Sequence, residues 1–524
     1  MKITTEFGNR TWLQLKHILA ALTGVLLLCL LAANGRAQTF TTLHSFTPPS
    51  GSEGYNGTNS DGVYPFRGLL LSGNTLYGVA QAGGSAGWGT IFAVNLNGTG
   101  FTTLYSFTAT SGTNGNYYYG AGTNSDGVGP NGGLILSGNT LYGTAVAGGS
   151  AGWGTVFAVN TNGTGFTTLH SFTATSGTNG GGFGTNSEGA SPYDGLMLSG
   201  NTLYGTTQFG GSAGWGTVFA VNTDGTGFTN LHIFSATTGS AGGDGINSDG
   251  ANPMGGLILS GNTLYGTALQ GGSSGWGTVF AVNTNGTGFR TLHSFTTPSG
   301  SGGYHGVNSD GAYPWDALIL SGNTLYGTAA DGGSSGWGTV FAVNTNGSGF
   351  RTVLSFTGGS SSASPVAGLI LSGNTLYGTT RDGGSGNYGT VFAVNTNGTG
   401  FTTLHIFAGA PKDGADPYAG LILSGTTLYG MTAHGGTYSC GTVFSLSYPA
   451  PQLTIMPSGT NVNLKWPSGV AGFSYSGCTL QSTTNLGSWA VWATNSSAPV
   501  VVNGQNVVTN STTGSQQFFR LISP

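Results

Sequence analysis

Short apolar runs alternate with glycine- and asparagine-rich segments along most of this chain. A typical unit begins with Gly-Leu-Ile-Leu-Ser at residues 133–137, turns at Ser-Gly-Asn, and continues as Thr-Leu-Tyr-Gly-Thr at residues 140–144. A glycine-rich loop leads to Gly-Thr-Val-Phe-Ala-Val at residues 154–159, and an Asn-Gly turn leads to a last apolar run at residues 166–172. Asn-Gly between apolar runs favours a tight hairpin, because both turn residues adopt positive φ. Each unit therefore predicts four antiparallel strands.

The unit recurs seven times. Its Leu-Tyr-Gly segment ends at Gly78, Gly143, Gly205, Gly266, Gly327, Gly378 and Gly430. Repeats of this size are typical of propellers, solenoids or arrays. Six copies end in a fourth strand, whereas the seventh stops at Leu446, and the missing strand matches residues 40–46. A closed ring explains this permutation, because the N-terminal strand can complete the last unit. Residues 38–448 are therefore predicted to form an all-β domain, a seven-bladed β-propeller closed by the N-terminal strand.

Residues 449–524 have a different pattern. Val462, Leu464 and Trp466 alternate with polar residues, and segments at 479–482, 489–492 and 517–521 predict further strands. About six short strands in a segment of this length favour a small β-sandwich of the immunoglobulin or fibronectin type.

The first 37 residues have the pattern of a secretory signal peptide. Lys2, Arg10 and Lys16 precede or border an apolar core at residues 18–33, and a small-residue cleavage site ends at Ala37. A retained anchor helix is the alternative, but 16 apolar residues are short for a span. We expect a secreted, extracellular protein with no membrane span after signal cleavage.

Charge excludes some partners. Charged residues make up only 5% of the chain, which has 11 Lys+Arg and 15 Asp+Glu. Removing residues 1–37 takes away four basic residues and one acidic residue, so the mature net charge is 7 minus 14, or −7. We therefore expect neither nucleic acid nor anionic membrane surfaces as partners. Cys440 and Cys478 lie in different predicted domains, which does not favour a disulfide. We expect a monomer without a cofactor.

The repeated pattern also resembles a known family. The recurring Asp-Gly-x-x-Pro, Gly-Leu-Ile-Leu-Ser-Gly-Asn-Thr-Leu-Tyr-Gly-Thr and Gly-Thr-Val-Phe-Ala-Val-Asn segments, over about residues 39–447, resemble the GloVer (Gloeo/Verruco) tandem-repeat family of secreted bacterial proteins. The resemblance implies no particular activity. Many relatives end in a sorting anchor that is absent here, so it does not imply attachment to the cell surface.

Two sets of polar residues recur across the repeats. An acidic residue lies four positions before a proline in six loops, and Ser361 replaces it in the sixth repeat; the acids are Asp61, Asp126, Glu188, Asp249, Asp310 and Asp413. We interpret them as Asx-type turns rather than a cation ring, since one carboxylate per loop is too few for calcium. A histidine recurs in the fourth strand, with Tyr105 and Leu354 in its place in two copies; the histidines are His44, His170, His232, His293 and His405. These are expected to pack or to face solvent, because outer strands lie too far apart for a shared metal ion.

Aromatic residues precede Gly-Thr-Val-Phe in most repeats. They are Trp88, Trp153, Trp215, Trp276, Trp337 and Tyr388, with Cys440 in the seventh copy. We predict buried wedges between blades, with sugar-stacking platforms as the alternative.

The residue after the loop proline varies while its neighbours stay nearly fixed. It is Phe66, Asn131, Tyr193, Met254, Trp315, Val366 and Tyr418. Because a packing position in a repeat should keep its size, we predict that Phe66, Tyr193, Trp315 and Tyr418 contact a ligand. Tolerated surface variation explains the pattern as well. Asp194 and Asp316 follow two of these aromatics, but they are predicted two blades apart, so no catalytic residue is assigned.

These observations favour a secreted, non-catalytic protein that binds a glycan or a cell-surface protein through the long-loop face of the propeller. The alternative is a polysaccharide-active enzyme, a lyase or glycosidase with its site at the channel mouth. A polar pocket there with two or more convergent charged groups would favour the enzyme.

Overall fold

The computed structural model describes most of the chain from residue 38 onward. The described residues are 38–50, 57–111, 122–177, 184–238, 245–300, 306–359, 362–448, 451–470, 473–475, 478–486, 490–495, 497–511 and 517–522. The predicted signal peptide, Ser361 and Trp489 lie outside these residues.

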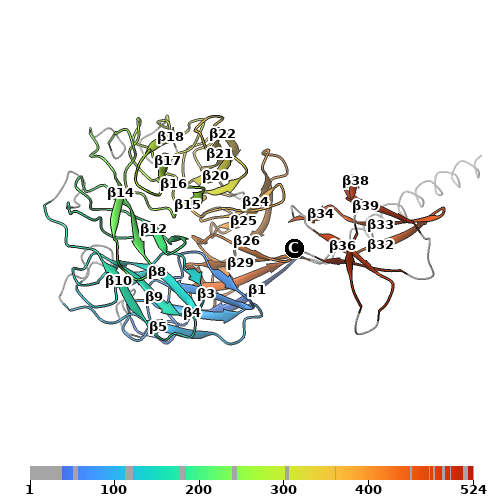
Figure 1. Ribbon diagram of the computed structural model, residues 1–524, viewed down its shortest axis with the longest axis horizontal. Coiled ribbons are helices and arrows are strands. Elements are labelled where there is room, and N and C mark those ends of the chain that lie inside the picture. Colours follow the sequence, from blue (N-terminus) through green and yellow to red (C-terminus); the bar gives the residue numbers. More distant parts are fainter. Residues whose placement is uncertain are drawn as a thin grey trace, which may run out of the picture.

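Seven antiparallel sheets make up the larger part of the described chain (Figure 1). Six have four strands, and the sheet of the second repeat has a fifth strand, β6 (Val128–Pro130). In six of them the first strand of the repeat is one edge and the last strand is the other, as in the order β2-β3-β4-β5. The prediction of an all-β protein with four strands per repeat is therefore confirmed. The strands of these sheets are β2 (Leu70–Ser72), β3 (Thr75–Ala80), β4 (Thr90–Asn95) and β5 (Thr102–Ser106); β6 (Val128–Pro130), β7 (Ile135–Ser137), β8 (Thr140–Ala147), β9 (Thr155–Asn160) and β10 (Thr167–Ser171); β11 (Met197–Ser199), β12 (Thr202–Thr207), β13 (Thr217–Asn222) and β14 (Thr229–Ile233); β15 (Ile258–Ser260), β16 (Thr263–Ala268), β17 (Thr278–Asn283) and β18 (Arg290–Ser294); β19 (Ile319–Ser321), β20 (Thr324–Ala329), β21 (Thr339–Asn344) and β22 (Arg351–Ser355); β23 (Ile370–Ser372), β24 (Thr375–Thr380), β25 (Thr390–Asn395) and β26 (Thr402–Ile406); and β28 (Ile422–Ser424), β29 (Thr427–Thr432), β31 (Thr442–Ser447) and β1 (Thr39–Ser45).

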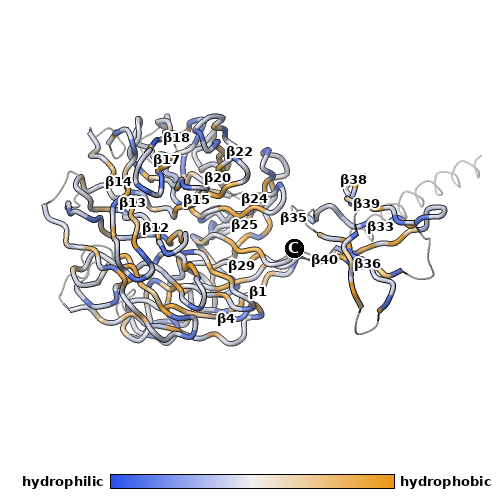
Figure 2. The backbone as a smooth tube through the Cα atoms, in the orientation of Figure 1, coloured by the Kyte–Doolittle hydropathy of each residue, from blue (hydrophilic) through white to orange (hydrophobic). Residues whose placement is uncertain are grey.

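The third strand of each repeat is buried on both faces. In β9, residues Thr155 to Val159 are all buried, so its apolar run is continuous rather than alternating. This is the pattern of a strand whose sheet is covered on both sides. Figure 2 shows apolar residues concentrated along such strands. The glycine of Leu-Tyr-Gly makes room for the packing, because a Cβ on Gly143 would lie 2.6 Å from the ring of Phe157.

Each sheet shares its core with the next. One cluster joins Leu264 and Phe280 of the fourth repeat to Val218 of the third, and the others join successive repeats in the same way. A further cluster joins Val443 and Met431 of the seventh repeat to Leu76 and Phe92 of the first. The first and last repeats are therefore packed together like neighbours.

The N-terminal strand β1 pairs with β31 of the seventh repeat. Phe40 lies opposite Leu446, and the register shifts between Thr42 and His44. The fourth strands of the other six repeats carry a shift at the equivalent place. The strand missing from the last repeat is thus supplied from the start of the chain, with the same bulge.

The C-terminal region forms smaller sheets, with the orders β32-β33-β39-β38, β37-β36-β40 and β34-β35. Their strands are β32 (Thr454–Ser458), β33 (Asn461–Pro467), β34 (Gly469–Val470), β35 (Phe473–Ser474), β36 (Thr479–Thr483), β37 (Ala493–Thr494), β38 (Val500–Val502), β39 (Gln505–Ser511) and β40 (Phe518–Ile522). The prediction of a strand at residues 489–492 is wrong for the described part of that segment, because β37 begins one residue after it. Trp492 instead stacks on Arg520. The immunoglobulin-like assignment and the domain limits remain predictions.

Three further observations complete the description of the fold. A short pair, β27 (Gly414–Ala415) and β30 (His434–Gly435), lies beside the seventh repeat. The described residues contain no helix with the length and apolar character needed to cross a bilayer. Cys440 and Cys478 are both free and buried.

Candidate functional site

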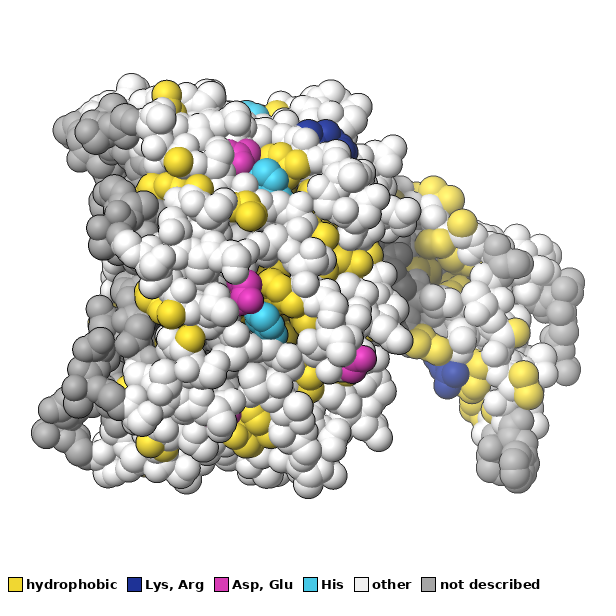
Figure 3. Space-filling view, turned by 60° about the vertical axis from the view of Figure 1, so that its left-hand side comes forward, with side chains coloured by type: hydrophobic (Ala, Val, Ile, Leu, Met, Phe, Trp, Pro, Cys, Tyr) yellow, Lys and Arg dark blue, Asp and Glu magenta, His cyan; other side chains and the backbone are white. Residues whose placement is uncertain are grey.

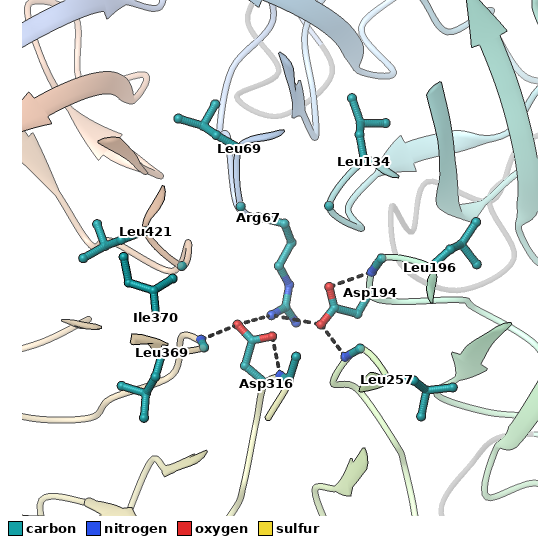
Figure 4. A pocket seen from close by; sticks show the side chains of 17 residues that line it. Arg67, Leu69, Leu134, Asp194, Leu196, Leu257, Asp316, Leu369, Ile370 and Leu421 are labelled. Atoms are coloured by element: carbon teal, nitrogen blue, oxygen red, sulfur yellow. Dashed lines mark hydrogen bonds and ion pairs between the residues drawn. The ribbon is translucent and has the colours of Figure 1, made fainter. Parts of the chain in front are cut away.

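All seven repeats contribute the same short segment to one pocket, which we call the central pocket. Its volume is about 260 Å³. It is lined by residues just before or at the start of each first strand: Arg67, Gly68, Leu69, Gly133, Leu134, Asp194, Gly195, Leu196, Gly256, Leu257, Asp316, Ala317, Gly368, Leu369, Ile370, Gly420 and Leu421. Figure 4 shows the leucines of six repeats spaced around Arg67. The first strands are shorter than predicted because their Gly-Leu halves turn into this pocket.

Three charged side chains converge in the central pocket. Nη1 of Arg67 lies 3.0 Å from Oδ2 of Asp316 and 3.7 Å from Oδ2 of Asp194 (Figure 4). The arginine side chain is 4% exposed, and the two carboxylates are about one-tenth exposed or less. Buried ions of opposite charge stabilise one another only when close and hydrogen-bonded, as they are here.

Main-chain amides complete the coordination of both carboxylates. Gly195 N–H donates to Oδ1 of Asp194 at 2.6 Å, and Gly256 N–H of the next repeat donates to Oδ2 at 2.7 Å. Asp316 is held in the same way by the N–H groups of Ala317 and Gly368, at 2.7 and 2.8 Å. Each carboxylate thus ties its own repeat to the following one and, through Arg67, to the first.

Burial perturbs the ionisation of this group. Burial, together with the charge of Asp194, raises the pKa of the Asp316 carboxyl to about 7 against the opposing effect of Arg67. Burial by itself would lower the pKa of Arg67, but Asp194 and Asp316 outweigh it, so that the arginine pKa is raised. The guanidinium therefore stays charged, while the Asp316 carboxyl can exchange a proton near neutral pH.

We expect Asp316 to make stability fall as pH rises from about 4 to 7. Between its ordinary pKa of about 3.9 and the folded value, only the folded protein holds the proton, so raising the pH removes a stabilising protonation. The effect is a few kcal/mol at most, at about 1.4 kcal/mol per pKa unit. Melting temperatures of wild type and Asp316→Asn between pH 4.5 and 8 measure it. The difference between the two proteins should change across this window; parallel curves would contradict the assignment.

The four candidate aromatics are all half-buried, and three have contacts around the central pocket. Each is followed within two residues by a pocket-lining residue. The ring of Tyr193 lies under the guanidinium of Arg67, 5.3 Å from its Cζ atom. Phe66 contacts Tyr418 with ring centroids 4.7 Å apart. Trp315 precedes Asp316 in the sequence. Their role in ligand contact remains a prediction.

At the same repeat position, the other three residues are buried: Asn131, Met254 and Val366. Asn131 donates to the carbonyl oxygen of Tyr193 at 3.2 Å. The variable position therefore divides into three buried residues and four half-buried aromatics.

The structure brings Asp194 and Asp316 together through Arg67, a residue that the sequence did not predict to be functional. Asp194 and Asp316 were set aside because they belong to repeats two apart, but the pocket is narrow enough for one arginine to reach both. A signal was available. The position after the variable residue holds Arg67, Gly132, Asp194, Gly255, Asp316, Ala367 and Ala419, so three charged residues share it in a chain with few charges.

The recurring acids and histidines form pairs rather than independent sets. Nε2 of His293 lies 2.9 Å from Oδ2 of Asp310, and four other histidines face their acids in the same way. Tyr105, which replaces histidine in one repeat, donates to Asp126 at 2.9 Å. Figure 3 shows histidine side chains beside acidic ones on the outer surface. The Asx-turn interpretation of the acids is wrong; the turn is made by a preceding asparagine such as Asn59, whose Oδ1 accepts from Gly62 and Gly84.

These histidines also connect neighbouring repeats through ring stacking. His293 stacks on Phe350 of the next repeat with a centroid distance of 3.5 Å. His405 of the sixth repeat stacks on Phe40 of β1, and His44 of β1 stacks on Phe101 of the first repeat. In four of the pairs a hydrogen bond joins the acid to the stacked histidine. At His170 the acid is Glu188, 3.4 Å away, and Nε2 has no hydrogen-bond partner among the described residues.

We expect the pair to be energetically coupled. Burial, which by itself would raise the pKa of Asp310, is outweighed by hydrogen bonds from His293 and Thr296, so the pKa is lowered and the carboxylate is ionised. In a double-mutant cycle, Asp310→Ser alone should destabilise the protein. His293→Leu should then lower the free energy of unfolding by about 1 kcal/mol less in the Asp310→Ser background than in the wild type. Leu354 occupies the histidine position in the next repeat, which makes leucine a native substitute. Urea unfolding of the four proteins measures the coupling; additive effects would contradict it.

The prediction of buried wedges before Gly-Thr-Val-Phe is right for Trp215 and Trp276 only. Trp88, Trp153 and Trp337 are half-buried, and Tyr388 is exposed. Trp276 is buried and packs edge-on against Tyr313 of the following repeat, with centroids 5.0 Å apart. The carbonyl oxygen at this position accepts a hydrogen bond from the next repeat in every case, including Tyr64 N–H of the first repeat to Cys440 of the seventh. Among the described side chains, no group of three or more His, Cys, Asp or Glu could hold a metal ion.

Comparisons with known proteins place the chain by its repeat. No curated protein matches it. Solved structures with similar folds include TolB from Acinetobacter baumannii, at 11% identity and TM-score 0.33, with 59% of this chain and 58% of TolB covered. The chain thus spans less than two-thirds of TolB.

Two other structures cover most of their own length. A putative 6-phosphogluconolactonase from Bacteroides uniformis is 14% identical, with TM-score 0.40 and coverage of 79% and 95%. The β-propeller domain of the Trilobed protease from Pyrococcus furiosus is 8% identical, with TM-score 0.38 and coverage of 73% and 95%. At these TM-scores the similarities carry no argument about activity.

The family comparison is more informative. A model described as the Gloeobacter/Verrucomicrobia repeat matches residues 121–241, 182–308 and 302–489. These three matches together span more than half of the chain and agree with the resemblance seen in its motifs. The chain therefore belongs to the Gloeobacter/Verrucomicrobia repeat family.

Proposed function

We propose that this is a secreted, non-catalytic binding protein, in which a seven-bladed propeller closed by β1 presents a ligand site on its long-loop face. Closure is supported by three contacts between the first and last repeats: the Val443–Leu76 core cluster, the Tyr64–Cys440 hydrogen bond and the stacking of His44 on Phe101. The same kinds of contact join the other successive repeats. A ring leaves no repeat with an uncovered face.

The observation that carries the binding function is the half-buried aromatic set beside a charged pocket. Tyr193, Trp315, Phe66 and Tyr418 keep part of their surface open to solvent, although other residues at their repeat position are buried. Aromatic faces next to carboxylates and a guanidinium are suited to glycan recognition, since the rings stack on sugar C–H groups and the ions bind hydroxyls. We therefore favour a glycan over a surface protein as the partner.

A glycan array with residues 38–524 tests the proposal. For any glycan bound, the variant Tyr193→Ala/Trp315→Ala/Tyr418→Ala should lose about tenfold or more in affinity, at about 1.4 kcal/mol per decade. Tyr438→Ala is the matched control, because Tyr438 is an exposed aromatic outside the pocket lining. Circular dichroism should be unchanged in both. An array without any binding, or equal losses in the triple variant and the control, would reject the proposal.

A second candidate is a polysaccharide-active enzyme, favoured by the convergence of Asp194 and Asp316 in the central pocket. An Asp316 pKa near 7 would suit a general acid. In a glycosidase the glycosidic bond that is cleaved lies between the two carboxyl groups. Here Nη1 of Arg67 lies in that place, close to both Oδ2 atoms, which argues against the enzyme. Depolymerisation of a polysaccharide by wild type, lost in Asp316→Asn, would favour the enzyme.

A further inference from the structure

Arg67 carries an unmet hydrogen-bond donor at the central pocket. Its Nη1 atom approaches both aspartates, but Nη2 has no hydrogen-bond partner among the described residues, and the side chain is 4% exposed. A buried N–H group without an acceptor is unfavourable, so the pocket favours a molecule that brings an acceptor oxygen.

The same pocket has spare acceptors. Oδ1 of Asp194 accepts one hydrogen bond from the described residues, from Gly195, and Oδ1 of Asp316 accepts one from Ala317. A carboxylate oxygen can accept two. The unmet donor and the two oxygens with spare acceptor capacity thus belong to three side chains that line the same pocket (Figure 4). Adjacent hydroxyl groups match this set, because each can accept from Arg67 and donate to a carboxylate.

Charge argues for a neutral ligand. When Asp316 holds a proton, the charges of the three side chains cancel, and when it is ionised they sum to −1, so the pocket has no net positive charge to attract an anion. A cation would have to share the carboxylates with Arg67, whose guanidinium already lies beside both. A ligand without net charge avoids both penalties.

Size limits the ligand to a single ring. The volume of about 260 Å³ is below the ~300–1,000 Å³ typical of sites for drug-sized ligands. The aromatic Tyr193 stacks on Arg67 and adds an apolar surface next to the charges.

We propose that the central pocket binds one neutral sugar ring, held by two adjacent hydroxyl groups between Arg67 and the carboxylates of Asp194 and Asp316. The proposal rests on the glycan-binding function above and names its site and ligand class. The ring would be a terminal unit of a longer glycan that extends over the long-loop face.

The test uses glucose, galactose and mannose, each beside its uronic acid and its amino sugar, with residues 38–524 at pH 7. Saturation-transfer NMR and calorimetry measure binding. We expect at least one neutral sugar to bind and its charged counterparts to bind about tenfold more weakly or worse. Tighter binding of a uronic acid or amino sugar overturns the proposal.

Two variants locate the site. Asp194→Asn removes one carboxylate, and Asp224→Asn is its matched control on an exposed turn, where other repeats carry asparagine at the same place, for example Asn162 and Asn285. Gly68→Val/Gly133→Val fills the pocket without touching the charges. A Cβ on these glycines would meet nothing closer than 4.0 and 3.7 Å, and Ala317 shows that a side chain fits at the position.

The valine variant keeps the test decisive if Asp194→Asn does not fold. We expect it to retain its circular dichroism and to lose sugar binding, while Asp224→Asn binds like wild type. Undiminished sugar binding by the folded valine variant overturns the central-pocket site but leaves glycan binding elsewhere on the protein intact. Absence of binding to these sugars and to the whole glycan array overturns both proposals.

Discussion

Deletion of residues 39–46 is expected to abolish the monomeric fold. The deletion removes β1, exposes the edge of β31, and takes away Phe46, which is fully buried between the first and last repeats. It also removes the stacking partners of His405 and Phe101. Unpaired strand edges recruit other chains, so the variant should aggregate, oligomerise or unfold.

Size-exclusion chromatography with light scattering and thermal unfolding measure the result. A synthetic peptide of residues 38–47 is the matched control, since it should pair with β31 and restore a monomeric complex. A monomeric deletion variant with an unchanged melting temperature would show that β1 has no structural role in completing the seventh repeat.

Replacement of Arg67 by methionine should destabilise the protein by about 3–5 kcal/mol, because it leaves two carboxylates buried without their cation. The loss should be largest above pH 7, where Asp316 must ionise or take up a proton at a cost. Chemical unfolding at pH 8 and pH 5 measures both effects. The triple variant Arg67→Met/Asp194→Asn/Asp316→Asn also removes the two unpaired carboxylates. It should therefore recover much of the lost stability.

A control variant shows whether the loss comes from the ion cluster around Arg67 or would follow the removal of any arginine. Arg290→Met is a suitable control, because Arg290 lies at the start of an outer strand and donates to the carbonyl oxygen of Thr345 without an acidic partner among the described ion pairs. Its loss should change stability by less than about 1 kcal/mol. Equal effects of the two arginine variants would contradict the account of the central pocket.

Local patterns in the sequence were enough to predict the repeat and its strands. The Asn-Gly turns, the buried Val-Phe-Ala-Val runs and the missing strand after Leu446 each express a rule that operates within one repeat or at the chain ends. The pairing of β1 with β31 follows from them. In the C-terminal region, the alternation of apolar and polar residues from Val462 to Trp466 correctly predicted β33. The strand expected at Trp492 was wrong, and the side chain of Trp492 stacks on Arg520.

The site was harder to predict because it depends on contacts between repeats. Nothing in the local sequence of Arg67 shows that Asp194 and Asp316 lie beside it; only the shared repeat position does. Three of the five histidine–acid pairs could have been found from a shared separation of 17 residues: His44–Asp61, His232–Asp249 and His293–Asp310. The separation differs at His405–Asp413, where it is 8 residues. Side-chain orientation and burial, which decide these contacts, are not encoded in the spacing alone.

Disulfide trapping of β1 against β31 tests the ring most directly. Thr41 and Ser445 are opposite each other in the pair, so cysteines there should lie within the ~4.4–6.8 Å Cα separation that a disulfide allows. In a background with Cys440→Ala and Cys478→Ala, the account predicts that Thr41→Cys/Ser445→Cys oxidises within the monomer, and that mass spectrometry of a digest finds the two peptides joined. The off-register pair Thr39→Cys/Ser445→Cys should remain largely reduced. Equal oxidation of the two pairs, or cross-links only between different chains, would contradict closure of the ring by the N-terminal strand.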